Sequence, residues 1–97
     1  MLRHIVMFNW KPEVTEEQIN AVAKGFAHLA EVIDVVIEMK FGKNLAIMDG
    51  CFDYAMSADF ESADDWMTYR NHPEHIKFAT NFASLASETA RIQFWLI

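Results

Sequence analysis

The segment Arg3-His4-Ile5-Val6-Met7-Phe8-Asn9-Trp10 decides the fold that this sequence predicts. Its side chains alternate between two faces, as they do along a β-strand, so residues 2–10 are expected to be extended. One face carries His4, Val6, Phe8 and Trp10, and the other carries Arg3, Ile5, Met7 and Asn9. Both faces are apolar at their centres, which indicates a strand covered on both sides.

The rest of the chain alternates between helical and extended patterns. A capping box, Thr15-Glu16-Glu17-Gln18, precedes apolar residues at helical spacing and predicts a helix over 15–33. Period-two alternation predicts further strands over 35–41, 51–60 and 90–97. Ser62 favours the start of a short helix, and Pro73 suits the first turn of another, with Asn71 or His72 as its cap.

This order of strand, helix, two strands, two helices and strand indicates an α+β fold. Right-handed crossovers turn it into a ferredoxin-like four-stranded antiparallel sheet with helices on one face. The uncovered face is expected to carry Ile5, Met7, Ala55, Trp95 and Ile97. Because an apolar sheet face is a poor surface for a soluble monomer, we expect a homodimer packed sheet to sheet into a dimeric α/β barrel.

Length, charge and cysteine content exclude several classes of protein. The 97 residues predict one domain spanning 1–97. A net charge of −6 without a basic run argues against nucleic-acid partners and against anionic membranes. No apolar run reaches the roughly 18 residues of a membrane span. Cys51 is the single cysteine, so no intrachain disulfide forms, and a cytoplasmic setting is expected.

Five stretches of the sequence resemble the stress-responsive A/B barrel (Dabb) family of the dimeric α/β barrel superfamily. They are residues 3–8, 11–19, 41–44, 54–60 and 72–78, the last containing His72-Pro73-Glu74-His75. The resemblance covers nearly the whole chain in order, and it implies the same fold and the same dimer. It implies no single activity, because most members of the family have none assigned.

One branch of this family consists of plant polyketide cyclases, which close a ring by an intramolecular aldol reaction without a cofactor. The resemblance places the catalytic histidine of that branch at His75 and its partner tyrosine at Tyr69. It places a pocket histidine of the first strand at His4. A pocket tyrosine of the first helix falls on Phe26, which lacks the hydroxyl.

The residue types leave two interpretations open for these positions. His75 lies on the apolar side of its predicted helix, where burial would favour a neutral imidazole that can accept a proton. It could equally be a core or helix-start histidine bonded to the backbone. Tyr69 could hydrogen-bond His75 or a developing oxyanion, or only close the rim of the core. His4 could contact substrate or bond to the last strand.

A group of large side chains is expected at the interface between helices and sheet, where it would either fill the core or line a ligand pocket. Together with His4, the predicted substrate-binding residues are Val6, Phe8, Phe26, Met39, Met56, Phe78, Phe82, Ile92 and Phe94. The pair His72 and His75 has spacing that could chelate a metal, but no third ligand is evident, so no metal site is predicted.

The leading hypothesis is a cofactor-independent enzyme of the polyketide cyclase or lyase type. It would act on an apolar, carbonyl-bearing small molecule, with His75 as the base, Tyr69 as its partner and His4 positioning a substrate oxygen. The alternative is a non-catalytic, ligand-binding or stress-responsive dimer. A third possibility, a heme- or oxygen-using monooxygenase, comes from other members of the superfamily.

Overall fold

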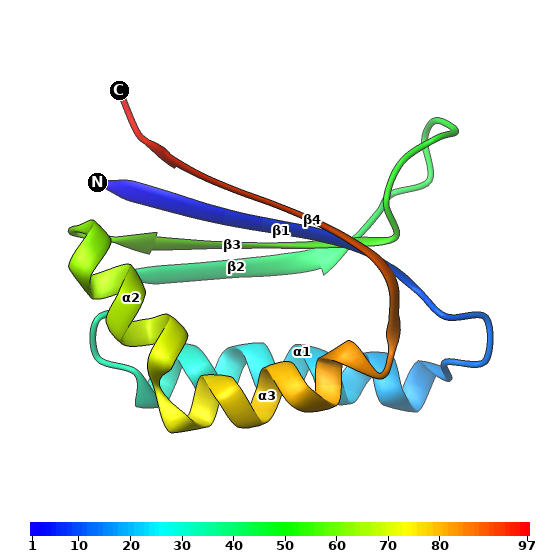
Figure 1. The fold of residues 1–97 in the computed structure, drawn as a ribbon. Helices are drawn as coiled ribbons and strands as arrows, with labels where there is room; N and C mark the ends of the chain where they lie inside the picture. Colours follow the sequence, from blue (N-terminus) through cyan, green and yellow to red (C-terminus); the bar gives the residue numbers. More distant parts are fainter.

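The computed structural model describes residues 1–97 as a four-stranded sheet with three helices on one face (Figure 1). The elements are β1 (Leu2–Trp10), α1 (Glu16–Val32), β2 (Glu38–Lys43), β3 (Tyr54–Phe60), α2 (Ala63–Asn71), α3 (Pro73–Ala83) and β4 (Ala86–Trp95). The strands lie in the order β2-β3-β1-β4, and every neighbouring pair is antiparallel. The ferredoxin-like prediction is therefore confirmed. None of the helices combines the length and apolar character needed to cross a bilayer.

The helix starts follow the capping signals in the sequence. At α1 the backbone N–H of Gln18 donates to the Thr15 hydroxyl at 3.2 Å, and the Gln18 side chain accepts the Thr15 N–H at 2.9 Å. Ser62 caps α2 with its side-chain oxygen. His72 caps α3 through Nδ1, and Pro73 occupies the first helical turn. These caps fix the entry of α3, and hence the position of the site described below.

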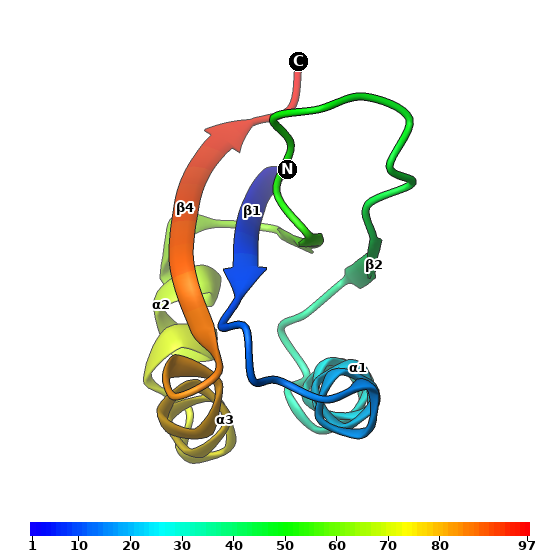
Figure 2. The same cartoon turned by 90° about the vertical axis from the view of Figure 1, so that its right-hand side faces the viewer.

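The core lies between the sheet and the helices. Its centre is Phe8, which is fully buried and meets the Phe82 ring edge to face at 4.6 Å. Helices α1 and α3 run side by side beneath the sheet (Figure 2). Their approach is close at Gly25, where an added Cβ would lie 2.6 Å from the Phe78 ring. The missing side chain of Gly25 therefore makes room for an aromatic ring of α3.

Three strands begin at positions that differ from the prediction. β2 begins at Glu38 rather than residue 35. β3 begins at Tyr54 rather than residue 51, because Asp53 forms side-chain hydrogen bonds that end the loop before the strand. The Asp53 carboxylate accepts the backbone N–H of Trp10 at 3.0 Å, and its own N–H donates to the Asn9 side chain at 2.9 Å. β4 begins at Ala86 rather than residue 90, because this segment already pairs with the end of β1, with Ala86 opposite Trp10 and Thr89 opposite Phe8.

The prediction for the two faces of β4 was wrong. Ile92 is paired with Ile5, and Phe94 with Arg3, so both lie on the uncovered face rather than at the helix–sheet interface. Trp95 is paired with Leu2 and lies on the helix side. A period of two shows which residues share a face but not which face points inward. Here the inward face of β4 is the more polar one, with Thr89, Arg91 and Gln93.

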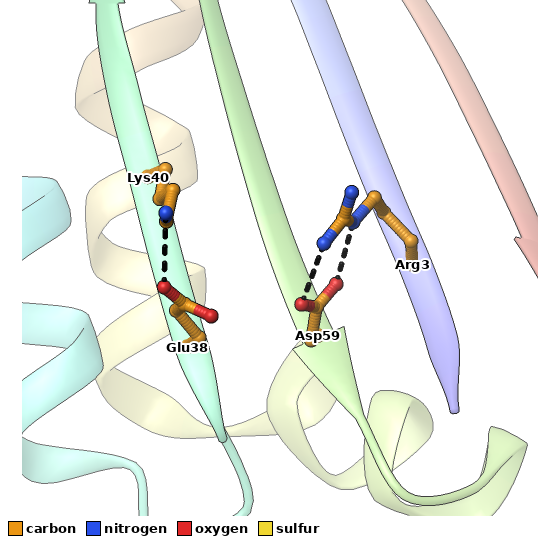
Figure 3. Close-up of polar contacts among 4 residues, drawn as sticks. All are labelled: Arg3, Glu38, Lys40 and Asp59. Atoms are coloured by element: carbon orange, nitrogen blue, oxygen red, sulfur yellow. Dashed lines mark hydrogen bonds and ion pairs between the residues drawn. The ribbon is translucent and has the colours of Figure 1, made fainter. Parts of the chain in front are cut away.

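The uncovered sheet face is apolar on β1 and β4 and charged toward β2. Met7, Ile92 and Phe94 are exposed there, with 53% of Ile92 accessible. Figure 3 shows the charged part: Arg3 donates from two nitrogens to both carboxylate oxygens of Asp59, at 2.8 and 2.9 Å, beside a Glu38–Lys40 pair. The face thus offers a partner both apolar area and ordered charges.

Candidate functional site

A cavity of about 470 Å³ lies between the sheet and the helices. This volume falls within the range of small-molecule sites. All three catalytic or pocket candidates, His4, Tyr69 and His75, line it. The predicted apolar residues that also line it are Val6, Phe26, Met56, Phe78 and Phe82. The structure therefore brings together eight of the twelve residues predicted for the site.

His75 sits in the first turn of α3, just after the cap at His72. Its Nδ1 donates to the backbone carbonyl of Arg70 at 3.0 Å, because a carbonyl oxygen can only accept. The neutral ring is then protonated at Nδ1, and its Nε2 keeps a free lone pair. Burial lowers the pKa of His75 below its usual 6.5, outweighing the opposite effect of the Arg70 carbonyl. His75 is thus a neutral base at pH 7.

His4 presents the opposite tautomer. The side-chain amide of Gln93, on the neighbouring strand β4, donates to His4 Nδ1 at 2.8 Å. The ring proton of neutral His4 is therefore on Nε2, where it can be donated to an oxygen. Burial lowers the pKa of His4 to about 4, with smaller contributions from the positive charge of Arg91 and from the protonated form of His75. Both imidazoles are consequently neutral at pH 7.

Tyr69 is a buried ring that supports His75. It is 1% exposed and lies between Phe60, at 5.2 Å, and the His75 ring, at 4.5 Å between centroids. Its hydroxyl forms no hydrogen bond with His75, so of the two functional roles considered for Tyr69, contact with a developing oxyanion is the one the geometry leaves available. Burial raises the pKa of Tyr69, which keeps the phenol protonated and able to donate.

Four of the predicted substrate-binding residues lie outside the cavity lining. Phe8 and Met39 belong to the packed core or its edge, and Ile92 and Phe94 lie on the other side of the sheet. Five lining residues were not predicted for the site: Trp66, Arg70, Ala79, Arg91 and Gln93. Trp66, Tyr69 and Arg70 have helical i, i+3, i+4 spacing, and this signal could have identified two of them.

Trp66 and Arg70 form one corner of the cavity. The Arg70 guanidinium carbon lies 5.7 Å from the centroid of the Trp66 ring, a cation–π contact. The indole N–H of Trp66 is buried without a hydrogen-bond partner. No cluster of three or more His, Cys, Asp or Glu side chains with the geometry to hold a metal ion is present.

The chain matches a known protein family over nearly its full length. A family model described as the Stress responsive A/B Barrel Domain matches residues 2–96. The chain belongs to this family. The resemblance inferred from the sequence motifs is therefore confirmed over nearly the full length.

The relatives of this chain include a protein named as an enzyme. Protein HS1 of Arabidopsis thaliana, named as a stress-response A/B barrel domain-containing protein, is 29% identical over 83 residues, covering 84% of this chain and 76% of its own length. Olivetolic acid cyclase of Cannabis sativa is 24% identical over 85 residues, covering 86% of this chain and 84% of the cyclase.

A solved structure from Thermobifida fusca has the same fold, with a TM-score of 0.91 and 29% identity. The similarity covers 98% of this chain and 90% of that protein, which is described as a dimeric ferredoxin-like protein of unknown function. One of these relatives is thus named as a cyclase, and another is described as a dimer.

Proposed function

We propose that this chain is a cofactor-independent enzyme of the polyketide cyclase or lyase type that acts on an apolar, carbonyl-bearing small molecule. The observation that carries the proposal is the pair of neutral imidazoles in one cavity. His75 offers a lone pair on Nε2, and His4 offers a proton on Nε2. The distant similarity to olivetolic acid cyclase supports the same reaction class.

The proposed reaction begins with proton abstraction next to a carbonyl. Nε2 of His75 accepts a proton from that carbon, and the electron pair moves onto the carbonyl oxygen to form an enolate. The His4 N–H and the Tyr69 hydroxyl donate hydrogen bonds to this oxygen. The enolate carbon then attacks a second carbonyl of the same molecule, and the protonated His75 returns its proton to the new alkoxide.

We also propose that the working form is a homodimer joined through the uncovered sheet face. The exposed apolar residues on β1 and β4 support it, because covering apolar surface removes it from water and lowers the free energy. The relative from Thermobifida fusca is described as dimeric. In this arrangement the partner covers the side of the sheet opposite the cavity, and the cavity itself stays within one subunit.

The test uses a simple ketone, so that the natural substrate need not be known. Exchange of the α-protons of 2-nonanone with D₂O, followed by NMR, reports the first step alone. We expect the protein to accelerate this exchange and His75→Ala to abolish the acceleration.

His28→Ala is the matched control, since His28 lies exposed on α1 outside the cavity. Equal rates for His75→Ala and the unmodified protein would refute the assignment of the base. A protein that binds the ketone without exchange would indicate the non-catalytic alternative.

A further inference from the structure

The cavity has an uneven distribution of charge. Its lining contains two arginines, Arg70 and Arg91, but no aspartate or glutamate. The chain as a whole carries 14 acidic residues against 8 lysines and arginines. Acidic side chains are therefore abundant elsewhere in the chain but absent from this lining.

The arginines of the cavity lining also differ from the remaining arginine in whether they form an ion pair. Of the three arginines in the chain, Arg3 forms the ion pair with Asp59 on the uncovered sheet face. The four ion pairs of the structure include neither Arg70 nor Arg91. Arg70 and Arg91, which form no ion pair, thus both line the same cavity, one from α2 and one from β4.

We propose that the ligand of this cavity is an apolar carboxylic acid whose carboxylate is bound by Arg70 and Arg91. This inference rests on the proposed function and names its substrate class, a keto acid rather than a neutral ketone. Guanidinium groups match carboxylates in geometry and are the side chains most often used to bind them. A local concentration of positive charge also attracts an anion despite the net negative charge of the protein.

Two further observations agree with an anionic ligand. The positive charges of Arg91 and Arg70 contribute to lowering the pKa values of His4 and His75, respectively, so their field reaches both imidazoles. The buried Trp66 N–H is another donor of the lining without an acceptor. Most of the remaining lining is apolar, so the ligand needs an apolar body attached to its acid group.

Binding of three eight-carbon probes tests the proposal by calorimetry at low salt. Octanoate carries the carboxylate, octanamide is its neutral isostere, and octyl phosphate carries a different anion. We expect octanoate to bind at least about tenfold more tightly than octanamide, as charge-assisted hydrogen bonds imply. Arg70→Gln and Arg91→Gln should each remove most of this preference. Lys24→Gln, which removes the same charge from an exposed position outside the cavity, should keep it.

Several results would overturn the carboxylate assignment. Equal affinity for octanoate and octanamide, or failure of both to bind, would be such a result. Loss of the preference for octanoate in Lys24→Gln, or tighter binding of octyl phosphate than of octanoate, would be another. Arg70→Lys and Arg91→Lys keep the charge and should retain part of the preference, which separates charge loss from misfolding. Octanoate binding as expected, together with no α-proton exchange in either 2-nonanone or the keto acid 7-oxooctanoate, would refute the proposed reaction and leave the acid site in place.

Discussion

The carbonyl oxygen of Arg70 accepts the Nδ1 proton of His75 at 3.0 Å, so the last turn of α2 determines the tautomer of a side chain on α3. Across the same cavity, Gln93 determines the opposite tautomer of His4. The two rings therefore differ in the group that Nε2 presents, a lone pair on His75 and an N–H on His4, although both are neutral. A base and a hydrogen-bond donor arise from the same residue type because different neighbours occupy Nδ1.

Nitrogen-15 NMR of the histidine rings should show these tautomers directly. We expect His75 to be protonated at Nδ1 and His4 at Nε2 at pH 7.5. Gln93→Leu should release the constraint on His4 and leave His75 unchanged. The exposed His28 provides the internal control. An Nε2-protonated His75 in the unmodified protein would contradict its role as the base.

The rate of ketone exchange should rise with pH and then level off. The base form of His75 is the neutral ring, and the pKa of His75 is lowered from 6.5 by burial. Its neutral form is therefore almost complete by pH 7.5, and we expect the midpoint of the rise in exchange rate below pH 6.5. A midpoint well above 6.5 would indicate that a different group removes the proton.

Stability should depend on pH through His4. Its pKa is about 4 in the folded protein and near 6.5 when unfolded, so the unfolded chain binds the proton more readily between these values. The stabilising contribution of neutral His4 is thus complete above pH 6.5 and is lost as pH falls toward 4. We expect His4→Gln to reduce the decline in unfolding free energy over this window by at most about 3 kcal/mol. Urea unfolding of both proteins at pH 7 and pH 4.5 measures it, and identical declines would contradict the burial of His4.

Two substitutions at Tyr69 should separate its ring from its hydroxyl. The ring is buried against Phe60 and His75, so Tyr69→Ala should cost about 3–5 kcal/mol of unfolding free energy. Tyr69→Phe removes a hydroxyl that bonds to no protein group, and should cost less than about 1 kcal/mol. If the hydroxyl donates to the enolate, Tyr69→Phe should still slow ketone exchange about tenfold or more. A stable Tyr69→Phe variant with an unchanged rate would limit Tyr69 to a packing role.

The dimer should depend on the β4 residues of the uncovered sheet face. Ile92→Lys places a charge opposite Ile5, in the centre of the expected contact. We expect light scattering to give the mass of a dimer for the unmodified protein and of a monomer for Ile92→Lys. Ala27→Lys, on the exposed side of α1, should remain dimeric. A dimeric Ile92→Lys would show that the subunits meet elsewhere.

Local signals in the sequence were sufficient for the architecture. The capping box at Thr15, the cap at Ser62 and the proline at residue 73 each mark a helix start that the structure contains. The alternation over residues 2–10 correctly placed His4 toward the helices. These features depend on neighbours within a few residues, so they could be predicted without knowledge of the fold.

The part of the site contributed by β4 could not be predicted in this way. Arg91 and Gln93 alternate with Ile92 and Phe94 along the strand. The alternation does not show which of the two faces points toward the helices. One face borders a cavity that accepts polar groups, and the other is free to meet a partner. The usual rule that apolar residues point inward therefore selected the wrong face, because on β4 the face toward the cavity is the more polar one.

The contact between Gly25 and Phe78 has a practical consequence for specificity. Gly25 is not part of the cavity lining, yet the ring it accommodates is. A single methyl group added at residue 25 would force that ring to move, and the chamber would change shape without alteration of any side chain that touches the ligand. Selectivity for chain length could therefore be engineered from the back of the helix layer, leaving the acid–base groups intact.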